Sequence, residues 1–315
     1  MFASVMGEWR FLGVCALTDA DIWQVNLWVC VAYLGATLAI LVDRSDVKVP
    51  VTTSYVAWNV RDDLGHQGES CEEGNCYLTV EHAPLRVLPE ISLARLIIAS
   101  HVLSFAWQFI VLFKGPVQRY YHAQRNLGRN PLRWIEYAIS SPLMIVVIAA
   151  ILGQPDAATL ALLAICTSAL MAFGYLTEAH YRMRPISVPH VCGWVLFTLV
   201  WAIITFTFVL GLNRAPTPPP ASVLAVVYPT YFIMLTFFSS FGIVQAVHLA
   251  TDMRDRQGWK NLKDRDIDEE HIPLKYNAVE MWYAILSLSS KIALSVLLYM
   301  LVRTRHRMLH LEFSD

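Results

Sequence analysis

The stretch WYAILSLSSKIALSVLLYMLV, residues 282–302, decides the class of this protein because it combines the length of a membrane span with one central charge. A membrane-spanning helix needs about 20 mostly apolar residues, and this stretch supplies them. Lys291 has apolar turns on both sides and no obvious route to either membrane surface. Because a free ammonium at that depth costs about 2.5 to 3.5 kcal/mol on insertion scales, we expect Lys291 to be functional.

Six more apolar stretches precede this one, and polar or Pro- and Gly-containing segments separate them. With 56% hydrophobic residues, 16% charged residues and a mean hydropathy of +0.46, the chain has too little polar surface for a soluble globule. We therefore predict an all-α membrane protein, one domain over residues 1–315, whose seven transmembrane helices form a bundle. The helices are expected near residues 22–42, 91–113, 134–152, 157–176, 190–212, 221–249 and 277–302.

The sizeable loop between the first two helices, residues 43–89, contains two stretches rich in β-branched and aromatic residues. They predict a small β-hairpin. Cys71 and Cys76 in CEEGNC could form a disulfide if the loop faces an oxidising side, whereas this spacing without partner ligands is a poor zinc signal. We favour the disulfide and expect no metal site.

The distribution of lysine and arginine predicts the orientation in the membrane. Loops on the side of the N-terminus carry 14 of these residues, against 8 on the opposite side. We therefore expect a cytoplasmic N-terminus, which has no cleavable signal pattern, and an outer C-terminus. The net charge of -1 argues against nucleic acid as a partner.

A buried lysine is the usual amine for a Schiff base with an aldehyde. Retinal is the membrane-soluble aldehyde that suits a helical bundle. A protonated Schiff base needs a nearby carboxylate, and Glu136 is the best placed. Ser287, four residues before Lys291, could bond to either group or to its own backbone. Asp156 and Glu178 lie at helix ends, where solvated or dipole-related charges are expected.

Two motifs resemble those of the heliorhodopsins. The sequence RWIEYAISSPLMIVVIA, residues 133–149, is similar to the third-helix motif of that family, and WYAILSLSSK, residues 282–291, to the seventh-helix motif. Weaker similarities are His101 in the second helix, MAFGYLTE (171–178), PHVCGWVLFTLVW (189–201) and FSSFGIV (238–244).

The resemblance implies a rhodopsin-like bundle with all-trans-retinal on Lys291, Glu136 as the counterion and Ser287 beside it. It also implies an orientation inverted relative to ordinary microbial rhodopsins, which the charge count gives independently, and a homodimer in the lipid bilayer. The implied pocket residues are Ser140, Met144, Met171, Trp201 and Phe241; without the resemblance, we would interpret such side chains as packing.

Several residues leave alternatives open. His101 could be a core histidine or a proton acceptor when the Schiff base loses its proton. Tyr33 stands where the family pattern has a histidine, and Pro142 removes a backbone donor and should kink its helix. The charged segment 251–276 is expected to be a solvated cytoplasmic loop rather than a docking or gating segment.

We predict a light sensor, not an enzyme, in which photoisomerisation of retinal towards the 13-cis form alters the bundle and signals to a cytoplasmic partner. A proton pump is disfavoured because no charged residue follows Glu136 through Leu152. One alternative is a light-gated passive ion or proton channel, and another is a retinal-free receptor or scaffold with a structural Lys291. A channel could be lined by Glu178, His101, His248, Gln245, Ser239 and Ser240.

Overall fold

The computed structural model describes residues 19–43, 46–62, 76–179, 187–214, 219–260 and 271–312. Within these ranges the chain forms eight helices and one two-stranded antiparallel sheet. Seven of the helices are long and apolar enough to cross a membrane. The predicted seven-helix bundle with a small hairpin is therefore confirmed, and the protein is an integral multi-pass membrane protein.

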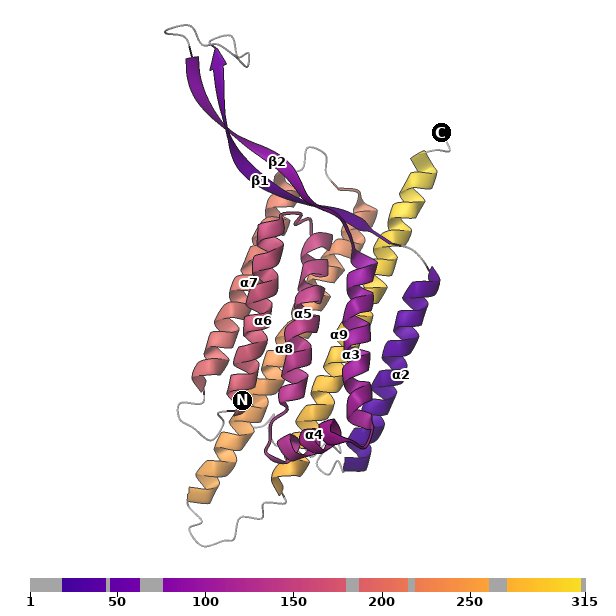
Figure 1. The fold of residues 1–315 in the computed structure, drawn as a ribbon, viewed down its shortest axis with the longest axis vertical. Helices are drawn as coiled ribbons and strands as arrows, with labels where there is room; N and C mark the ends of the chain where they lie inside the picture. The colour runs from indigo at the N-terminus through magenta and orange to yellow at the C-terminus, as the bar shows by residue number, and fades with distance from the viewer. Residues whose placement is uncertain are drawn as a thin grey trace.

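The elements follow one another in the order helix, hairpin, seven helices (Figure 1). They are α2 (Asp19–Asp43), β1 (Lys48–Asp62), β2 (Cys76–Ser92), α3 (Leu93–Leu112), α4 (Pro116–Asn126), α5 (Pro131–Ile151), α6 (Ala157–Ala179), α7 (Ser187–Arg214), α8 (Ala221–Lys260) and α9 (His271–Glu312). The sequence did not predict the short helix α4, which begins at Pro116, a residue whose missing N–H costs nothing in a first turn.

Neighbouring helices close the bundle. Helix α9 packs against α2 and α8, α3 packs against α2 and α5, and α6 packs against α5 and α7. Helix α5 also contacts α8 and α9, so it occupies the centre of the bundle (Figure 1). This position explains why α5 has the most deeply buried spanning segment, with Ile145, Val147 and Ile148 fully enclosed.

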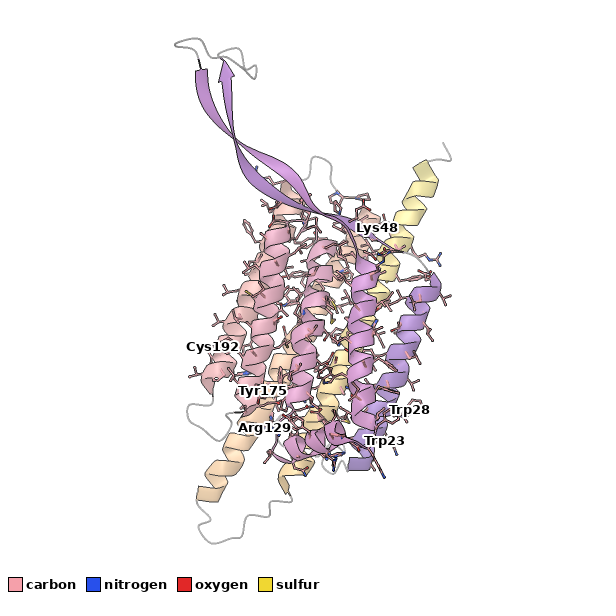
Figure 2. The ribbon with its side chains drawn as sticks, in the orientation of Figure 1. Trp23, Trp28, Lys48, Arg129, Tyr175 and Cys192 are labelled. Carbon is pink, nitrogen blue, oxygen red and sulfur yellow. The ribbon has the colours of Figure 1, made fainter. Side chains whose placement is uncertain are left out.

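The outer surface of the bundle is apolar, as a membrane requires. Trp28 of α2 is 70% exposed, and Val31, Leu34 and Leu38 continue the same exposed surface. Trp23 and Trp28 lie towards the end of α2 that is near α4 (Figure 2). Tryptophans at this level are typical of the interface between lipid and water.

Helix α5 begins with a cap and continues through an internal proline. The side chain of Asn130 accepts a hydrogen bond from the backbone N–H of Arg133 at 3.2 Å, and Pro131 occupies the first turn. The helix then continues through Pro142 to Ile151. Ala138, four residues before Pro142, accepts a hydrogen bond from Ser168 of α6 instead.

The hairpin projects from the bundle at the end where α9 finishes (Figure 1). Its strands pair from Lys48 with Ser92 to Asp62 with Cys76, with register shifts near Val51. The backbone N–H of Thr52 donates to the carbonyl of Pro155 at 3.0 Å, which ties the hairpin to the turn between α5 and α6. Cys71 lies outside the described residues, so its disulfide with Cys76 stays a prediction.

The prediction of a loop over residues 251–276 was wrong for most of that segment. Helix α8 continues to Lys260, and α9 already begins at His271, so both helices extend beyond their apolar spans. Lysine, arginine and glutamine are good helix formers, so a spanning helix can continue through charged sequence. Residues 261–270 lie outside the described residues.

Candidate functional site

Lys291 lies at the centre of a buried polar cluster. The side chain is 2% exposed, and its Nζ donates to Glu136 Oε1 at 2.9 Å. The hydroxyl oxygens of Ser140 and Ser287, both at 3.2 Å, and that of Ser104 also lie within hydrogen-bonding distance of Nζ, so its three N–H groups are shared among four acceptors. Oxygen acceptors from three helices therefore surround the ammonium, which offsets part of the cost of burying its charge.

The carboxylate of Glu136 is held as closely as the ammonium. Ser140, one turn later in α5, donates to Oε1 at 2.9 Å, and Ser104 of α3 donates to the same oxygen. Because each serine hydroxyl has one proton, these contacts orient both serines towards the ion pair. The structure thus places Glu136, Ser140 and Ser287 against Lys291.

Two members of the cluster were not among the predicted site residues. Ser104 lies in the apolar sequence SHVLSFAW, where a serine usually bonds to its own helix. Its Oγ is also 3.0 Å from the Ser100 carbonyl, but its one proton points to the nearer Glu136 Oε1. The hydroxyl of Tyr33 lies 3.0 Å from Ser287 Oγ. No sequence signal singles out Ser104, because its role depends on how α3 is rotated against α5.

His101 lies beside this cluster and not within it. It is fully buried, its ring centroid is 5.8 Å from that of Tyr33, and its Nε2 is 3.5 Å from the hydroxyl of Ser295. Ser295 in turn donates to the backbone carbonyl of Lys291 at 2.8 Å. His101 therefore contacts the helix of the lysine, one turn beyond the ammonium.

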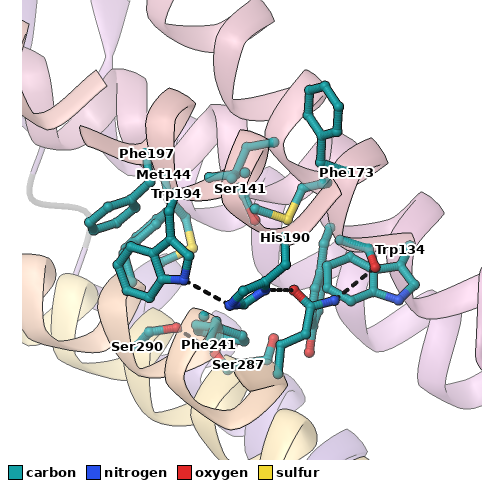
Figure 3. A pocket seen from close by; sticks show the side chains of 18 of the residues that line it. Trp134, Ser141, Met144, Phe173, His190, Trp194, Phe197, Phe241, Ser287 and Ser290 are labelled. Carbon is teal, nitrogen blue, oxygen red and sulfur yellow. Dashed lines mark hydrogen bonds between the residues drawn. The ribbon is translucent and has the colours of Figure 1, made fainter. Parts of the chain in front are cut away.

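An apolar cavity opens beside Lys291 and Ser287 (Figure 3). It encloses about 760 Å³ of empty space, its open mouth included, between α5, α6, α7, α8 and α9. Three of the predicted pocket residues, Met144, Met171 and Phe241, line it. Trp201 is not among the lining residues and packs behind the wall against the rings of Phe197 and Phe238, so its place in the pocket stays a prediction.

Two glycines make room for the tryptophans of the cavity wall. A Cβ atom at Gly174 would lie 2.2 Å from the ring of Trp134, and one at Gly242 would lie 2.7 Å from that of Trp194. Any larger residue would displace an indole ring, so both positions require glycine.

A short chain of hydrogen bonds crosses the cavity wall (Figure 3). The indole N–H of Trp194 donates to His190 Nε2 at 2.9 Å, and His190 Nδ1 lies 3.2 Å from Gln245 Oε1. The amide of Gln245 donates to the carbonyl of Gly174 at 2.8 Å. Helices α6, α7 and α8 are thereby linked around the cavity.

The comparisons with known proteins agree with this geometry. The family model described as Heliorhodopsin matches residues 22–262, most of the chain. The chain belongs to the heliorhodopsin family. It is therefore a membrane photoreceptor whose family uses retinal as its chromophore.

A solved rhodopsin structure shows the same fold at low sequence identity. The rhodopsin of Exiguobacterium sibiricum is similar with a TM-score of 0.55 and 12% identity over 92% of this chain and all of that one. The proton-pumping rhodopsin of the marine alga Acetabularia acetabulum has a TM-score of 0.49 and 9% identity, covering 94% and 99% of the two chains. No curated protein matches the sequence of this heliorhodopsin.

The residues around the cavity fit a retinal chromophore. Retinal is a long apolar aldehyde, and the cavity offers apolar and aromatic walls with one primary amine, Lys291. The amine is buried beside a carboxylate, the arrangement that would keep a positive charge on its nitrogen. The indole of Trp194 and the ring of Phe241, which line the cavity, are among the side chains that would hold the chromophore.

A second buried ionic cluster lies near the start of α5 in this heliorhodopsin. The guanidinium of Arg133 bonds to both Glu178 of α6 and Glu280 of α9. Glu178 is 2% exposed and also accepts from Trp134 Nε1 at 2.7 Å and from Tyr276 at 3.1 Å. The expectation of a solvated Glu178 was therefore wrong, because residues of α5 and α9 enclose the end of α6.

Proposed function

We propose that this protein is a light sensor in which Lys291 carries retinal and Glu136 is the counterion. The observation that carries the proposal is the buried contact of 2.9 Å between Lys291 Nζ and Glu136 Oε1 at the edge of an apolar cavity. All-trans-retinal, bound as a Schiff base, would supply light absorption and the isomerisation that follows it.

The chain's own residues would hold and move one proton at the Lys291 nitrogen. Glu136 presents a carboxylate already oriented by Ser104 and Ser140, so it can accept that proton over a short distance. Ser287 and Tyr33 form a second branch on the same nitrogen. A change in the position of this nitrogen would break several of these contacts at once and alter how α3, α5 and α9 pack.

Proton pumping is less well supported because the outer half of the bundle lacks a carboxylate path. Beyond Glu136, α5 has no Asp, Glu, Lys, Arg or His through Ile151, and α9 has none between Lys291 and Arg303. Fully or almost fully buried side chains fill this region instead, including Ile148, Leu163 and Ile204. A pump needs acid and base groups on both sides of its Schiff base.

A passive channel is the second candidate, and the packing favours the sensor over it. Ser239 and Ser240 donate to carbonyl groups of their own helix, at 2.7 Å each, and Gln245 is bound to Gly174 and His190. Glu178 is committed to Arg133. The polar groups of these four residues are therefore bonded to other groups of the protein, in several separate clusters.

Voltage-clamp recording of cells that express the protein with retinal separates the two candidates. The sensor proposal predicts a light-induced absorption change in the purified protein and no photocurrent at any holding potential. A photocurrent that reverses with the gradient of one ion would instead establish the channel. A Glu136→Gln variant serves as the control for effects of the pigment on membrane conductance.

We also propose an orientation of the bundle in the membrane, an oligomeric state and a partner. The excess of lysine and arginine supports a cytoplasmic N-terminus and an outer C-terminus. We infer a homodimer and a cytoplasmic signalling partner, and no enzymatic activity. A retinal-free receptor or scaffold is the alternative if the protein binds no aldehyde.

A further inference from the structure

A small hollow, with about 360 Å³ of empty space when its open mouth is included, joins the two buried ionic clusters. Glu136 lines it from one cluster, and Arg133 and Glu280 line it from the other. Gln108 of α3 and Asn130, which precedes α5, also face this space. The apolar cavity beside Lys291 is separate and has no wall residue from α3 or α4.

One buried donor on the wall of the hollow points to water inside it. The indole Nε1 of Trp107 has no hydrogen-bond partner among the described residues. Buried polar groups of this kind are normally satisfied by ordered water when the space is large enough. Water in the hollow would connect Glu136 with Glu280 by hydrogen bonds.

The two carboxylates that share Arg133 are held unequally. Glu178 accepts from Arg133, Trp134, Tyr276 and the backbone N–H of Asn130. Glu280 accepts from Arg133 and from Asn130 Nδ2 at 2.5 Å. Each donor stabilises the ionised form, so Glu280 is the carboxylate that gains a proton at the lower cost.

The other charged and titratable groups near Glu280 include Glu178, Arg125, Tyr276 and Tyr121. Glu178 shares Arg133 with Glu280, and Arg125 of α4 is a further buried cation at this end of the bundle. Tyr276 and Tyr121 are neutral phenols at ordinary pH. One guanidinium thus faces two carboxylates directly, and a proton on Glu280 would relieve their repulsion.

We propose that Glu280 is a proton-accepting site that exchanges with Glu136 through the hydrated hollow. This inference rests on the proposed function. In the first step the N–H bond at Lys291 breaks and an O–H bond forms on Glu136. In the second, the O–H bond of Glu136 breaks, the proton crosses the water, and an O–H bond forms on Glu280; the return reverses both steps without net transport.

The first test is an acid titration of the retinal-free protein, followed by infrared spectroscopy of the carboxyl groups. We expect a buried carboxyl band that disappears in Glu280→Gln and persists in Glu178→Gln, the matched control on the same arginine. A band that persists in Glu280→Gln, or that both variants lose, would overturn the assignment.

The second test is the light-minus-dark infrared spectrum of the retinal-bound protein. The Glu280 carboxyl band should rise after illumination, and Gln108→Leu should slow its rise by at least about tenfold, because the side chain of leucine excludes water from the hollow. If Glu280→Gln does not fold, Gln108→Leu carries the test alone, and an unchanged rise contradicts the proposal.

The two proposals fail in different ways. If no visible band forms with retinal, the photoreceptor assignment of Lys291 fails whatever the titration shows. If the pigment forms and responds to light while Glu280 stays ionised, the proton-accepting role of Glu280 alone is wrong.

Discussion

Ser168 of α6 donates its hydroxyl hydrogen bond to the carbonyl of Ala138 in α5, at 2.9 Å. Ala138 lies four residues before Pro142, which has no N–H, so the serine replaces the helical donor that the proline removes. A carbonyl without a partner in the apolar part of a membrane is costly. The neighbouring helix therefore makes the proline tolerable in the middle of the bundle.

Ser168→Ala should lower the free energy of unfolding by about 1 kcal/mol, the usual net contribution of one hydrogen bond. Thermal denaturation in detergent measures this loss. The variant Ser168→Ala with Pro142→Ala should recover it, since alanine restores the backbone donor. Equal stability of the wild type and Ser168→Ala would show that the bond contributes nothing.

Gly174→Ala should reduce the yield of the pigment, because the added Cβ would lie 2.2 Å from the ring of Trp134 in the cavity wall. The absorbance of the retinal-bound protein, divided by total protein, measures the yield. Gly211→Ala is the matched control, since nothing lies within 4 Å of a Cβ at that helical position. An equal yield of both variants would contradict the close packing at Gly174.

Ser104→Ala should move the acid-induced colour change of the pigment to higher pH. The hydroxyl of Ser104 donates to the carboxylate of Glu136, so its loss makes protonation of that carboxylate easier. A spectroscopic pH titration follows the transition. Ser100→Ala is the control, because its hydroxyl bonds to the carbonyl of Ile97 in its own helix at 2.8 Å; identical titrations of the two variants would exclude a role for Ser104.

Asp156 caps α6, and the cap should depend on pH. The side chain and the backbone N–H of Thr159 both donate to its Oδ2, at 2.7 and 2.8 Å, and these bonds lower the pKa of the Asp156 carboxyl. Because the folded pKa is depressed, the stabilisation is present above the unfolded pKa of about 3.9 and is lost as the pH falls through the folded value.

Asp156→Ala should therefore lower the free energy of unfolding by about 1 kcal/mol at neutral pH. The difference from the wild type should shrink in acid below about pH 4, which thermal denaturation at several pH values would reveal. A difference that does not change with pH would mean that the charge of Asp156 plays no part. Asp156→Asn keeps a capping acceptor and is the control.

The spanning helices could be predicted from the sequence because the requirement for about 20 apolar residues acts on each segment separately. Their ends were less predictable. Charged residues follow the apolar part of α8, and neither hydropathy nor charge shows whether such a segment continues as helix to Lys260. The start of α9 at His271 was missed for the same reason.

Site residues could be predicted where a single residue is unusual in its sequence context. They could not be predicted where their contacts depend on how the helices are rotated against one another. A lysine within an apolar span, Lys291, attracts attention in any sequence, and Glu136 does so next. Ser104 and Tyr33 are ordinary residues of apolar helices, and their contacts appear once α2, α3, α5 and α9 are packed. The pairing of Arg133 with Glu280 joins residues 147 positions apart in the chain and had no local signal.

The visible absorption spectrum after expression with all-trans-retinal is the decisive test of whether Lys291 and Glu136 form the chromophore site. We predict a visible band for the wild type, no band for Lys291→Ala, and a band displaced to longer wavelength for Glu136→Gln, because the negative charge beside the nitrogen is removed. A wild-type protein that stays colourless with retinal, or a Lys291→Ala variant that keeps the band, would contradict this assignment.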